Sequence, residues 1–562
     1  MIPQDYKERL AAALPSGKNI IVEAGAGTGK TTLLADRLCY LILGKGIKID
    51  EIVALTFTDK AAAEIKLRLL ETMRSILADL KLPEPKLEVT KNLTDGEYFK
   101  KTKEELAETI ETSFELIERA QICTIHSFAL QILRLYPLAA GLAPDIEIDT
   151  GFIANYIFNK NWSVFLEEEL SLSSPHRALW GKLLEKFSLE TLKEFALLLL
   201  EPYFDYCKFD SSSEEIQTFF ARKVSLMKSL LLSNTPEGKK RKIENQIEEA
   251  INRIENLSKN MATLSKAELL KLPVQEEIVF VKSSKPPKGW ENEEDIEAVK
   301  NFITLANTLT PTNLDLLEQT YNLFSAFTQK VKREMIKQNV VSYNQSILFA
   351  RDLVEKDLSV RAELKKRYKS IMIDEFQDTD LAQGQLLLFL SEAQNSVAKK
   401  WQDIVLEQGK LFVVGDPKQS IYRFRGANIS AYEKFLELMQ KQQARTCFLT
   451  TNFRSQKNII SFVNKWGKNA IKEKPLIQPP YIALETGKEE LGEKVEFLQI
   501  TGKEKQKQDD LRANEANIVA AWIKENVGIK KIKQDKTLSY KDITILYSAG
   551  RSEERFSRNA ET

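Results

Sequence analysis

The stretch EAGAGTGKTTLLADRL, residues 23–38, leads from a short apolar run through a loop of small residues into a helical pattern. From Ala24 to Thr31 it reads A-x-x-x-x-G-K-T, the phosphate-loop pattern with alanine in the first place instead of glycine. Small residues let successive backbone N–H groups and the N-terminus of the following helix face phosphate oxygens. The stretch therefore predicts an α/β fold with a nucleotide site at the end of its first strand.

ATP with Mg²⁺ is the ligand that this loop predicts. Lys30 is expected to reach the β and γ oxygens, and Thr31 to offer its hydroxyl to the metal ion. A glycine-rich turn from strand to helix, without a ligand, is the alternative interpretation. The remaining contacts to the nucleotide are expected from the other loop residues, which are Ala24, Gly25, Ala26, Gly27, Thr28, Gly29 and Thr32.

Short β-branched or apolar runs recur along the chain, and a helical pattern follows each of them. Strands that alternate with helices favour a parallel sheet covered on both faces. The expected strands are residues 20–22, 52–55, 122–125, 371–373 and 411–414.

Two charged, helix-favouring segments interrupt this alternation, a small one at about residues 76–118 and a large one at about residues 140–335. Their charge runs are ordinarily solvated helix faces. The large segment therefore predicts an all-helical insertion in the α/β core. One helical stripe of apolar residues in it consists of Ile243, Ile247, Ala250, Ile251, Ile254 and Leu257.

A second α/β pattern begins near residue 441. Strands are expected at residues 495–500 and 542–547, around a helix at residues 515–527. The residues after this pattern give no further strand or helix expectation.

Composition places the chain among large soluble proteins. Its 562 residues are 43% hydrophobic and 29% charged, which suits roughly three or four domains. Lysine and arginine (81) balance aspartate and glutamate (80), so a polyanion would have to be held by a local basic surface. Four distant cysteines and two histidines offer no zinc spacing. Without a signal peptide or an apolar run of about 20 residues, a reducing cytoplasmic location and no membrane partner are expected.

A second acidic site follows a strand in IMIDEFQDTD, residues 371–380. Asp374 at the strand end can hold Mg²⁺ through its water shell, and Glu375 can orient and deprotonate the attacking water. An acidic helix N-terminus is the alternative, mainly for Asp378 and Asp380. The pair Asp374 and Glu375 makes ATP hydrolysis a stronger prediction than ATP binding alone.

Six stretches in order resemble the successive motifs of superfamily 1 DNA helicases of the UvrD/Rep type. The form of the fifth stretch and the large insertions make the chain most similar to the RecB/AddA branch, from about residue 20 to 465. The resemblance implies RecA-like domains. The six stretches are AGAGTGKTT, ALTFTDKAAAEIKLRL, CTIHSFALQIL, IMIDEFQDTD, LFVVGDPKQSIYRFRGA and LTTNFRS.

The resemblance implies further roles around the nucleotide. Gln419 and Arg454 would contact the γ-phosphate and report hydrolysis to the part of the protein that holds DNA. Phe453 stands where the family usually has a tyrosine that stacks on adenine. Gln4 is the candidate for hydrogen bonds to the adenine edge, with Arg9 nearby, and a short helix without ligand contacts is the alternative.

The resemblance also implies a track for single-stranded DNA. Hydroxyls, a few basic groups and interleaved aromatics suit sequence-tolerant binding, although an aromatic beside a strand end is commonly core. Asp59 departs from the usual asparagine of the family. The expected track residues are Thr56, Phe57, Thr58, His126, Ser127, Tyr422, Phe424 and Arg425.

These expectations give a domain plan. Residues 1–140 and 336–440 would form the first RecA-like domain, residues 141–335 a helical insertion domain, and residues 441–562 an incomplete start of a second RecA-like domain. Neither a VHxxKGLEW-like nor an ALTRA-like stretch, which carries the completing arginine of the family, follows. The chain is therefore expected to be an N-terminal fragment that binds nucleotide without unwinding DNA alone.

The function that this implies is an ATP-dependent DNA helicase or translocase moving 3′ to 5′ in DNA repair or recombination. Single-stranded DNA and 3′-tailed duplex would be its substrates, and a second subunit of a RecBCD/AddAB-like complex its partner. The alternative is a non-motor subunit that binds ATP and DNA. A P-loop kinase or GTPase has no place for Gln419 and Arg454.

Overall fold

The computed structural model describes residues 3–149, 151–200, 214–235, 242–273, 275–280, 290, 292–421, 429–471, 480–488, 495–496, 508–533 and 536–546. The chain divides into two compact units. The first comprises residues 1–454 and 467–487, and the second residues 455–466 and 488–562.

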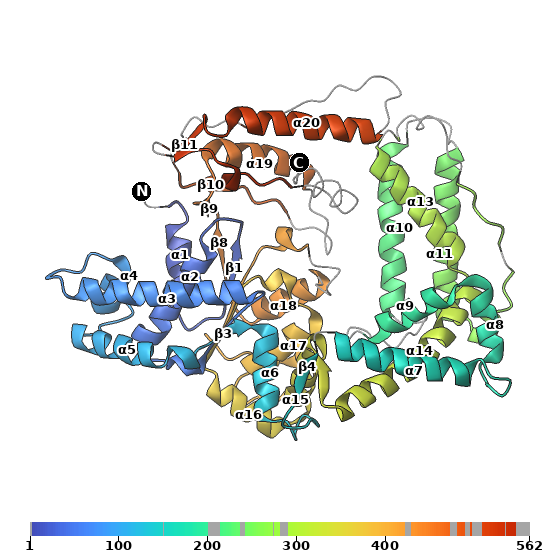
Figure 1. Cartoon of the computed structure of the whole chain (residues 1–562), viewed down its shortest axis with the longest axis horizontal. Coiled ribbons are helices and arrows are strands. Elements are labelled where there is room, and N and C mark those ends of the chain that lie inside the picture. The colour runs from blue at the N-terminus through green and yellow to red at the C-terminus, as the bar shows by residue number, and fades with distance from the viewer. Residues whose placement is uncertain are drawn as a thin grey trace. The chain divides into compact units, whose positions relative to one another are not determined.

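A parallel sheet of six strands organises the first unit (Figure 1). All five expected strands belong to it, so the predicted α/β fold with a RecA-like core is confirmed. Its order is β3-β2-β6-β7-β1-β8, and every neighbouring pair is parallel. The strands are β1 (Ile20–Ala24), β2 (Ile52–Thr56), β3 (Gln121–Thr124), β6 (Ser370–Ile373), β7 (Leu411–Gly415) and β8 (Arg445–Leu449).

The last strand lies beyond the boundary expected near residue 441. β8 pairs with β1 from Ile20 opposite Arg445 to Ala24 opposite Leu449. Its Cys447 and Leu449 are buried in the core. Without β8, the strand before the phosphate loop would present an unpaired edge. The first sheet therefore continues past residue 440.

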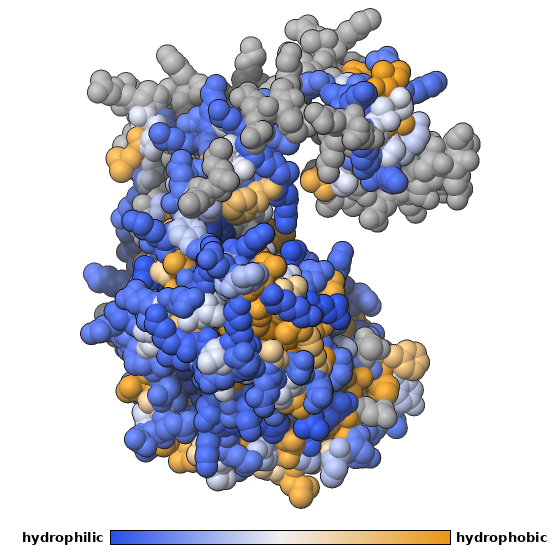
Figure 2. All heavy atoms as spheres, turned by 90° about the vertical axis from the view of Figure 1, so that its left-hand side faces the viewer, coloured by the Kyte–Doolittle hydropathy of each residue, from blue (hydrophilic) through white to orange (hydrophobic). Residues whose placement is uncertain are grey.

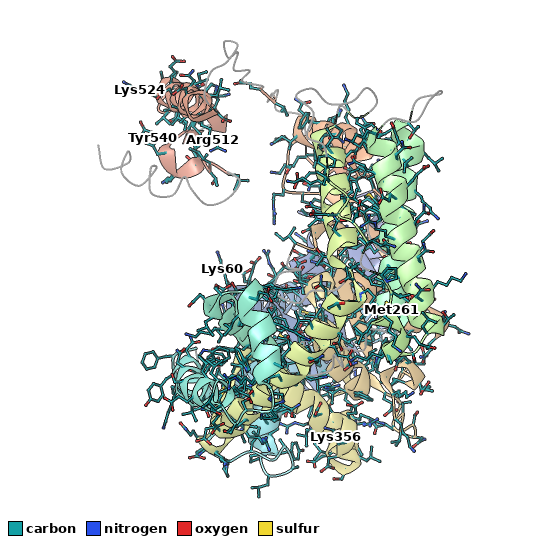
Figure 3. The ribbon with its side chains drawn as sticks, turned by 90° about the vertical axis from the view of Figure 1, so that its right-hand side faces the viewer. Lys60, Met261, Lys356, Arg512, Lys524 and Tyr540 are labelled. Atoms are coloured by element: carbon teal, nitrogen blue, oxygen red, sulfur yellow. The ribbon has the colours of Figure 1, made fainter. Side chains whose placement is uncertain are left out.

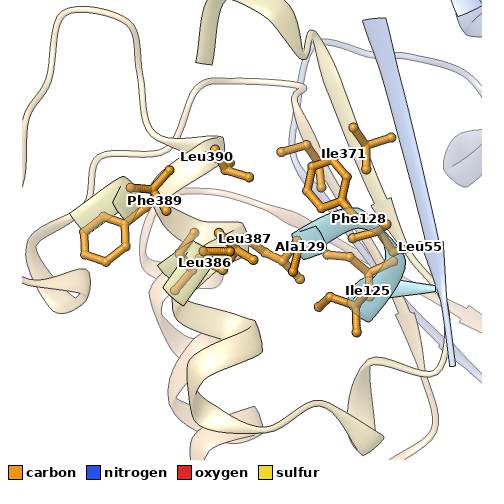
Figure 4. Packing of buried hydrophobic residues seen from close by; sticks show 14 of the residues in the cluster. Leu55, Ile125, Phe128, Ala129, Ile371, Leu386, Leu387, Phe389 and Leu390 are labelled. Carbon is orange, nitrogen blue, oxygen red and sulfur yellow. The ribbon is translucent and has the colours of Figure 1, made fainter. Parts of the chain in front are cut away.

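Alternating side chains of the strands feed two hydrophobic cores, one on each face of the sheet. In β2, Val53 and Leu55 face one core, and Ile52 and Ala54 the other. The first core is closed by helices that include α6 and α17; Figure 4 shows Leu55 and its neighbours there. The helices of this face are α6 (Ile125–Leu135), α15 (Tyr343–Lys356), α16 (Leu358–Arg367), α17 (Leu381–Ser391) and α18 (Ile429–Lys441).

The opposite face is covered by the helix that follows the phosphate loop and its neighbours. The expected small insertion is helical, and Figure 2 shows this side of the molecule as mostly hydrophilic, as solvated charge runs should be. The helices are α1 (Tyr6–Ala13), α2 (Lys30–Cys39), α3 (Asp59–Leu80), α4 (Glu88–Thr94) and α5 (Lys103–Glu115).

The large insertion is helical, as expected, and has two hydrophobic clusters of its own. The predicted apolar stripe is buried along α11, down to Met261 near its C-terminal end (Figure 3). The helices are α7 (Phe152–Glu169), α8 (Arg177–Lys186), α9 (Leu189–Leu200), α10 (Glu214–Asn234), α11 (Lys242–Thr263), α12 (Lys266–Leu269), α13 (Glu293–Thr308) and α14 (Pro311–Lys337).

A two-stranded parallel sheet joins the two ends of this insertion. β4 (Glu147–Asp149) precedes its helices and β5 (Val340–Ser342) follows them, with Ile148 opposite Val341. The carboxylate of Asp149 accepts hydrogen bonds from the backbone N–H groups of Ile153 and Ala154. The insertion therefore leaves and re-enters the core at one place.

The second unit contains the expected helix, α20 (Gln508–Asn526), and the hairpin of β11 (Lys531–Lys533) and β12 (Lys536–Thr537). The strand expected at residues 542–547 is wrong over residues 542–546, which have no strand structure. Leu546 is 91% exposed, and an isolated apolar run without a paired neighbour gains little from extension. Most of the strand expected at 495–500 lies outside the described residues.

Two smaller points complete the description. α19 (Lys457–Ala470) begins in the second unit and ends in the first, whereas β9 (Thr451–Asn452) and β10 (Glu485–Thr486) belong to the first. Cys39, Cys123 and Cys447 are free thiols, and Cys207 lies outside the described residues. No helix in the described ranges combines the length and apolar character that a membrane crossing needs.

Candidate functional site

The phosphate loop connects β1 to α2 at the carboxyl edge of the sheet. Gly27 and Gly29 have φ values of 73° and 83°, a backbone region that favours glycine. The Thr28 hydroxyl donates to the Gly25 carbonyl at 2.8 Å, which closes the turn. Gly29 is the N-cap of α2, so the helix N-terminus faces the loop. The predicted strand, loop and helix are therefore all present.

The segment after β8 packs directly against this loop. The Asn452 side-chain amide donates to the Ala26 carbonyl at 2.6 Å, and the Phe453 N–H donates to the Gly27 carbonyl at 2.9 Å. A Cβ on Gly27 would lie 2.7 Å from the Cβ of Arg454. The structure thus brings Arg454 next to the loop, as its predicted contact with the γ-phosphate requires.

Lys30 and Glu375 meet across the carboxyl edge of the sheet. The Lys30 Nζ lies 2.6 Å from Oε1 of Glu375. Glu375 has a φ of 52°, uncommon for a residue with a side chain, and stands directly after Asp374 at the end of β6. Backbone strain of this kind persists where surrounding contacts hold a residue in place.

Asp374 is the best placed metal ligand among the predicted residues. Its N–H donates to the Leu55 carbonyl, which fixes it at the sheet edge. Burial and then the negative charge of Glu375 raise the pKa of Asp374 to about 6, and Lys30 opposes this rise. A divalent cation would relieve the repulsion between the carboxylates. Mg²⁺ keeps several waters and needs few protein ligands, so Asp374 with the Thr31 hydroxyl fits such an ion.

Hydrogen bonds lead from Glu375 to the next strand. Gln377 donates from Nε2 to Oε2 of Glu375 at 2.8 Å, and its Oε1 accepts from the Asp416 N–H at 2.9 Å. The Asp416 carboxylate in turn accepts from Gln419 Nε2 at 2.8 Å and from the Lys418 ammonium at 2.8 Å. Gln419 is thereby connected to Glu375 through Gln377 and Asp416.

The base side of the site is built by α1. Arg9 donates to the Thr28 carbonyl at 2.6 Å, forms an ion pair with Asp5 at 2.7 Å, and lies 4.9 Å from the centre of the Phe453 ring. Phe453 remains 43% exposed, as a base platform would. Gln4, the expected reader of the adenine edge, is exposed. Its amide nitrogen, oriented by its surroundings, faces the carboxylate of Glu485.

Predicted DNA contacts meet at the ends of β2 and β3, where Thr56 lies opposite Thr124. Thr56 is buried and its hydroxyl donates to the Thr58 carbonyl at 2.9 Å. The Thr58 hydroxyl accepts from the Ala61 N–H and so caps α3. The Ser127 hydroxyl lies 2.9 Å from that of Thr124, the N-cap of α6. These hydroxyls have structural partners, and their contacts with DNA stay predictions.

His126 and Phe57 are half-buried beside this cluster. Burial lowers the pKa of His126, while a hydrogen bond with Asn344 opposes this shift. The ring of Tyr343, which is 52% exposed, stands edge-on to His126 with ring centres 6.0 Å apart. Tyr343 is therefore an aromatic candidate for base stacking that the sequence interpretation missed.

Three predicted DNA contacts, Tyr422, Phe424 and Arg425, lie outside the described residues. Of the residues that the sequence interpretation left without a role, Gln377 had the clearest signal, because it stands inside IMIDEFQDTD. Asn452 stands in LTTNFRS, but its contact with Ala26 depends on the added strand β8. The remaining nucleotide candidates, Ala24, Gly25, Lys30, Thr31 and Thr32, lie in the loop and first turn of α2 as expected.

Comparison with known proteins extends these observations. The chain is similar to proteins named as the AddA subunit of an ATP-dependent helicase/nuclease. The protein of Listeria welshimeri is 24% identical over 95% of this chain and 46% of its own length. That of Streptococcus thermophilus is 26% identical over 81% and 38%, and that of Carboxydothermus hydrogenoformans 26% over 96% and 48%. The chain spans about half the length, or less, of these relatives.

Residues 6–440 match the UvrD/REP helicase N-terminal domain. This range contains the phosphate loop, the Asp374 and Glu375 pair and Gln419, in the order that the motifs predicted. The resemblance to UvrD-type helicases near the RecB/AddA branch is confirmed by the match and by these relatives. The chain belongs to the UvrD/REP helicase family.

Proposed function

We propose that this chain provides the ATP site and part of the DNA track of an ATP-dependent DNA helicase or translocase. The observation that carries the proposal is the ion pair between Lys30 and Glu375, which joins the phosphate loop to the acidic strand end at 2.6 Å. A phosphate-binding cation and a candidate base for water need to meet at one place for a terminal phosphate to be hydrolysed.

Bound Mg-ATP would supply the competing anion for Lys30. The lysine then leaves Glu375 for the β and γ oxygens, while Thr31 and Asp374 hold the metal ion. Glu375, released from its ion pair, orients the attacking water and accepts its proton. Arg454, next to Gly27, adds positive charge beside the transferring phosphate.

The hydrogen bonds through Gln377 give hydrolysis a route to the rest of the sheet. Gln377 touches both Glu375 and the N–H of Asp416, and Asp416 holds Gln419. When Glu375 changes partner, Gln377 and Gln419 lose or gain a partner as well. In the proposed motor, this exchange couples the state of the terminal phosphate to the segment after Gln419, where Tyr422, Phe424 and Arg425 are the predicted DNA contacts.

The proposed substrates are single-stranded DNA and 3′-tailed duplex, and the proposed direction is 3′ to 5′. The relatives are named for an ATP-dependent helicase/nuclease of several chains, which supports a role in DNA repair or recombination beside a partner protein. A motor with this polarity displaces streptavidin from the 5′ end of a single strand faster than from the 3′ end. The reverse order would overturn the direction.

Substitution of Lys30 tests the ATP site. Lys30→Ala removes the charge on the β and γ oxygens and should weaken Mg-ATP binding by about 2 kcal/mol, or roughly 30-fold, because a charge-assisted hydrogen bond is lost. Isothermal titration calorimetry of the purified chain measures this. Lys45→Ala is the matched control, since Lys45 is exposed after the far end of the same helical segment. Equal ATP affinity in the wild type and Lys30→Ala would reject the site.

A further inference from the structure

A short strand far along the chain returns to the nucleotide site. β10 pairs in parallel with β9, with Glu485 opposite Thr451. The Glu485 N–H donates to the Thr450 carbonyl at 2.9 Å, and the Gly487 N–H to the Asn452 carbonyl at 2.8 Å. β9 itself leads into Phe453, so β10 lies beside the segment that forms the base platform.

The residues that flank Glu485 pack on the site itself. A Cβ on Gly25 of the phosphate loop would lie 2.8 Å from Cδ2 of Leu484. A Cβ on Gly487 would lie 2.8 Å from Cδ1 of the Phe453 ring. Glu485 stands between these two contacts, and its exposed side chain is therefore held at the base end of the site.

The Glu485 carboxylate meets the side-chain amide of Gln4. With its nitrogen toward the carboxylate, the amide donates to Oε1 of Glu485 at 2.6 Å and also to Oε2. Both residues are anchored on one peptide segment. Asp5, next to Gln4, accepts from the N–H groups of Thr450 and Thr451, while Glu485 binds the Thr450 carbonyl.

We propose that Glu485 positions the Gln4 amide and thereby makes the nucleotide site select adenine over guanine. A glutamine amide alone can rotate by half a turn and offer either a donor or an acceptor. A carboxylate accepts only, so it holds the nitrogen of the amide and leaves the carbonyl oxygen of Gln4 for the base. This inference rests on the proposed ATP site.

The chemistry of the two purines explains the selection. Adenine carries an exocyclic amine at the position where guanine carries a carbonyl oxygen. The amine can donate to the fixed Gln4 oxygen, whereas the guanine oxygen would face that oxygen and the negative charge of Glu485. A site built around such a hydrogen bond rejects the analogue that cannot make it, because its polar groups are left unpaired.

The test measures the ratio of ATP to GTP affinity by competition against a fluorescent ATP analogue with Mg²⁺. The wild type should prefer ATP, and Glu485→Gln should lower the ratio about tenfold, since a glutamine at this position no longer fixes the Gln4 amide. Glu8→Gln is the matched control. It removes an equal charge from an exposed residue of α1 whose partner is Arg445, and should keep the wild-type ratio.

A double-substitution cycle separates positioning from a direct contact. If Glu485 acts through Gln4, Glu485→Gln should change the ratio in the wild type and leave it unchanged in a Gln4→Ala background. A full effect in that background, or an unchanged ratio in the single variant, overturns the inference while ATP binding stands. Failure of the wild type to bind Mg-ATP would overturn both the inference and the proposed ATP site.

Discussion

Gly27 shows how tightly the phosphate loop is packed from behind. Its φ of 73° is strained for any residue with a side chain, and a Cβ there would lie 2.7 Å from both Nδ2 of Asn452 and Cβ of Arg454. Either the loop or the segment at Asn452 must move to admit one methyl group. The close approach therefore holds Arg454 beside the loop.

Gly27→Ala should lower ATP affinity by at least tenfold and also lower the melting temperature, because strain and a clash act together. Calorimetric titration and thermal unfolding measure the two effects. Gly46→Ala is the control, since Gly46 has a similar φ of 68° and open space around it. It should show the strain alone, with unchanged ATP affinity. Equal effects of the two substitutions would mean that the contact with Asn452 and Arg454 is unimportant.

Tyr343 is a separate test of the DNA track. If its exposed ring stacks on bases beside His126, Tyr343→Ala should reduce single-stranded DNA affinity by about 1–3 kcal/mol without a strong base preference. Fluorescence anisotropy with labelled oligonucleotides measures the loss. Tyr98→Ala is the control, because Tyr98 is 55% exposed, close to the 52% of Tyr343, and lies in the small insertion. Comparable losses in both variants would remove Tyr343 from the track.

At this scale, the sequence predicts residues that lie within one contiguous motif. Lys30 and Asp374 are found because their neighbours in the chain identify them. Gln377 stands in such a motif as well, but its role depends on the Asp416 N–H, which only the pairing of β6 with β7 brings near. Tyr343 approaches His126 only after the large insertion has returned the chain to the core. Partners that meet through sheet pairing carry no local signal.

Among the elements, α2 carries a buried charge behind the phosphate loop. Burial raises the pKa of Asp36 to about 6 from its ordinary value of 3.8, and the positive charge of Arg68 on α3 only partly opposes this. The folded chain therefore binds the Asp36 proton more tightly than the unfolded chain between about pH 4 and 6. The ionised carboxylate costs stability above pH 6, and this cost disappears as the pH falls toward 4.

Asp36→Asn should make the chain more stable than the wild type by about 2 kcal/mol at pH 8, because the ionisation cost is removed. The difference should shrink as the pH falls through 6 and vanish near pH 4. Urea unfolding at the three pH values measures it. Asp95→Asn, at an exposed position, should change stability little at any pH. A constant difference across the three values would exclude Asp36 as the titrating group.

The elements that the sequence predicts best are those with a long period or a complete motif. The stripe of α11 is an example, since Ile247 and its neighbours are buried as their spacing predicts. The strand at residues 445–449 was not assigned to the first sheet, because its sequence, RTCFL, fits an edge strand of either domain. The run at residues 542–546 has apolar character but no pairing partner among the described strands, and pairing is what turns such a run into a strand.

For the whole molecule, charge balance limits how DNA can be held. The formal net charge is +1, and the described track residues carry no full positive charge, since burial lowers the pKa of His126. Arg425 is the single cation among the predicted track residues. DNA binding should therefore rest on stacking and neutral hydrogen bonds more than on counterion release.

The expected dependence of single-stranded DNA affinity on salt is shallow. Each phosphate contact contributes a slope of about −0.7 to the plot of log affinity against log salt concentration, so a total of about −1 to −2 is expected. Anisotropy titrations between about 50 and 200 mM salt measure it. Arg425→Gln should flatten the slope by about 0.7. A slope steeper than about −4 would require a basic surface outside the predicted track.

The order of the sheet also sets a timetable for the ribosome. Both neighbours of β1, which are β7 and β8, follow it late in the chain, and Asn19 accepts a hydrogen bond from Leu411, 392 residues further on. At about 5–20 residues per second, synthesis of that interval takes roughly 20–80 s. During this time the nascent chain holds an apolar strand without a partner, while the helices of the insertion can already form from local contacts. Chaperone protection of residues 20–24 during translation follows from this geometry.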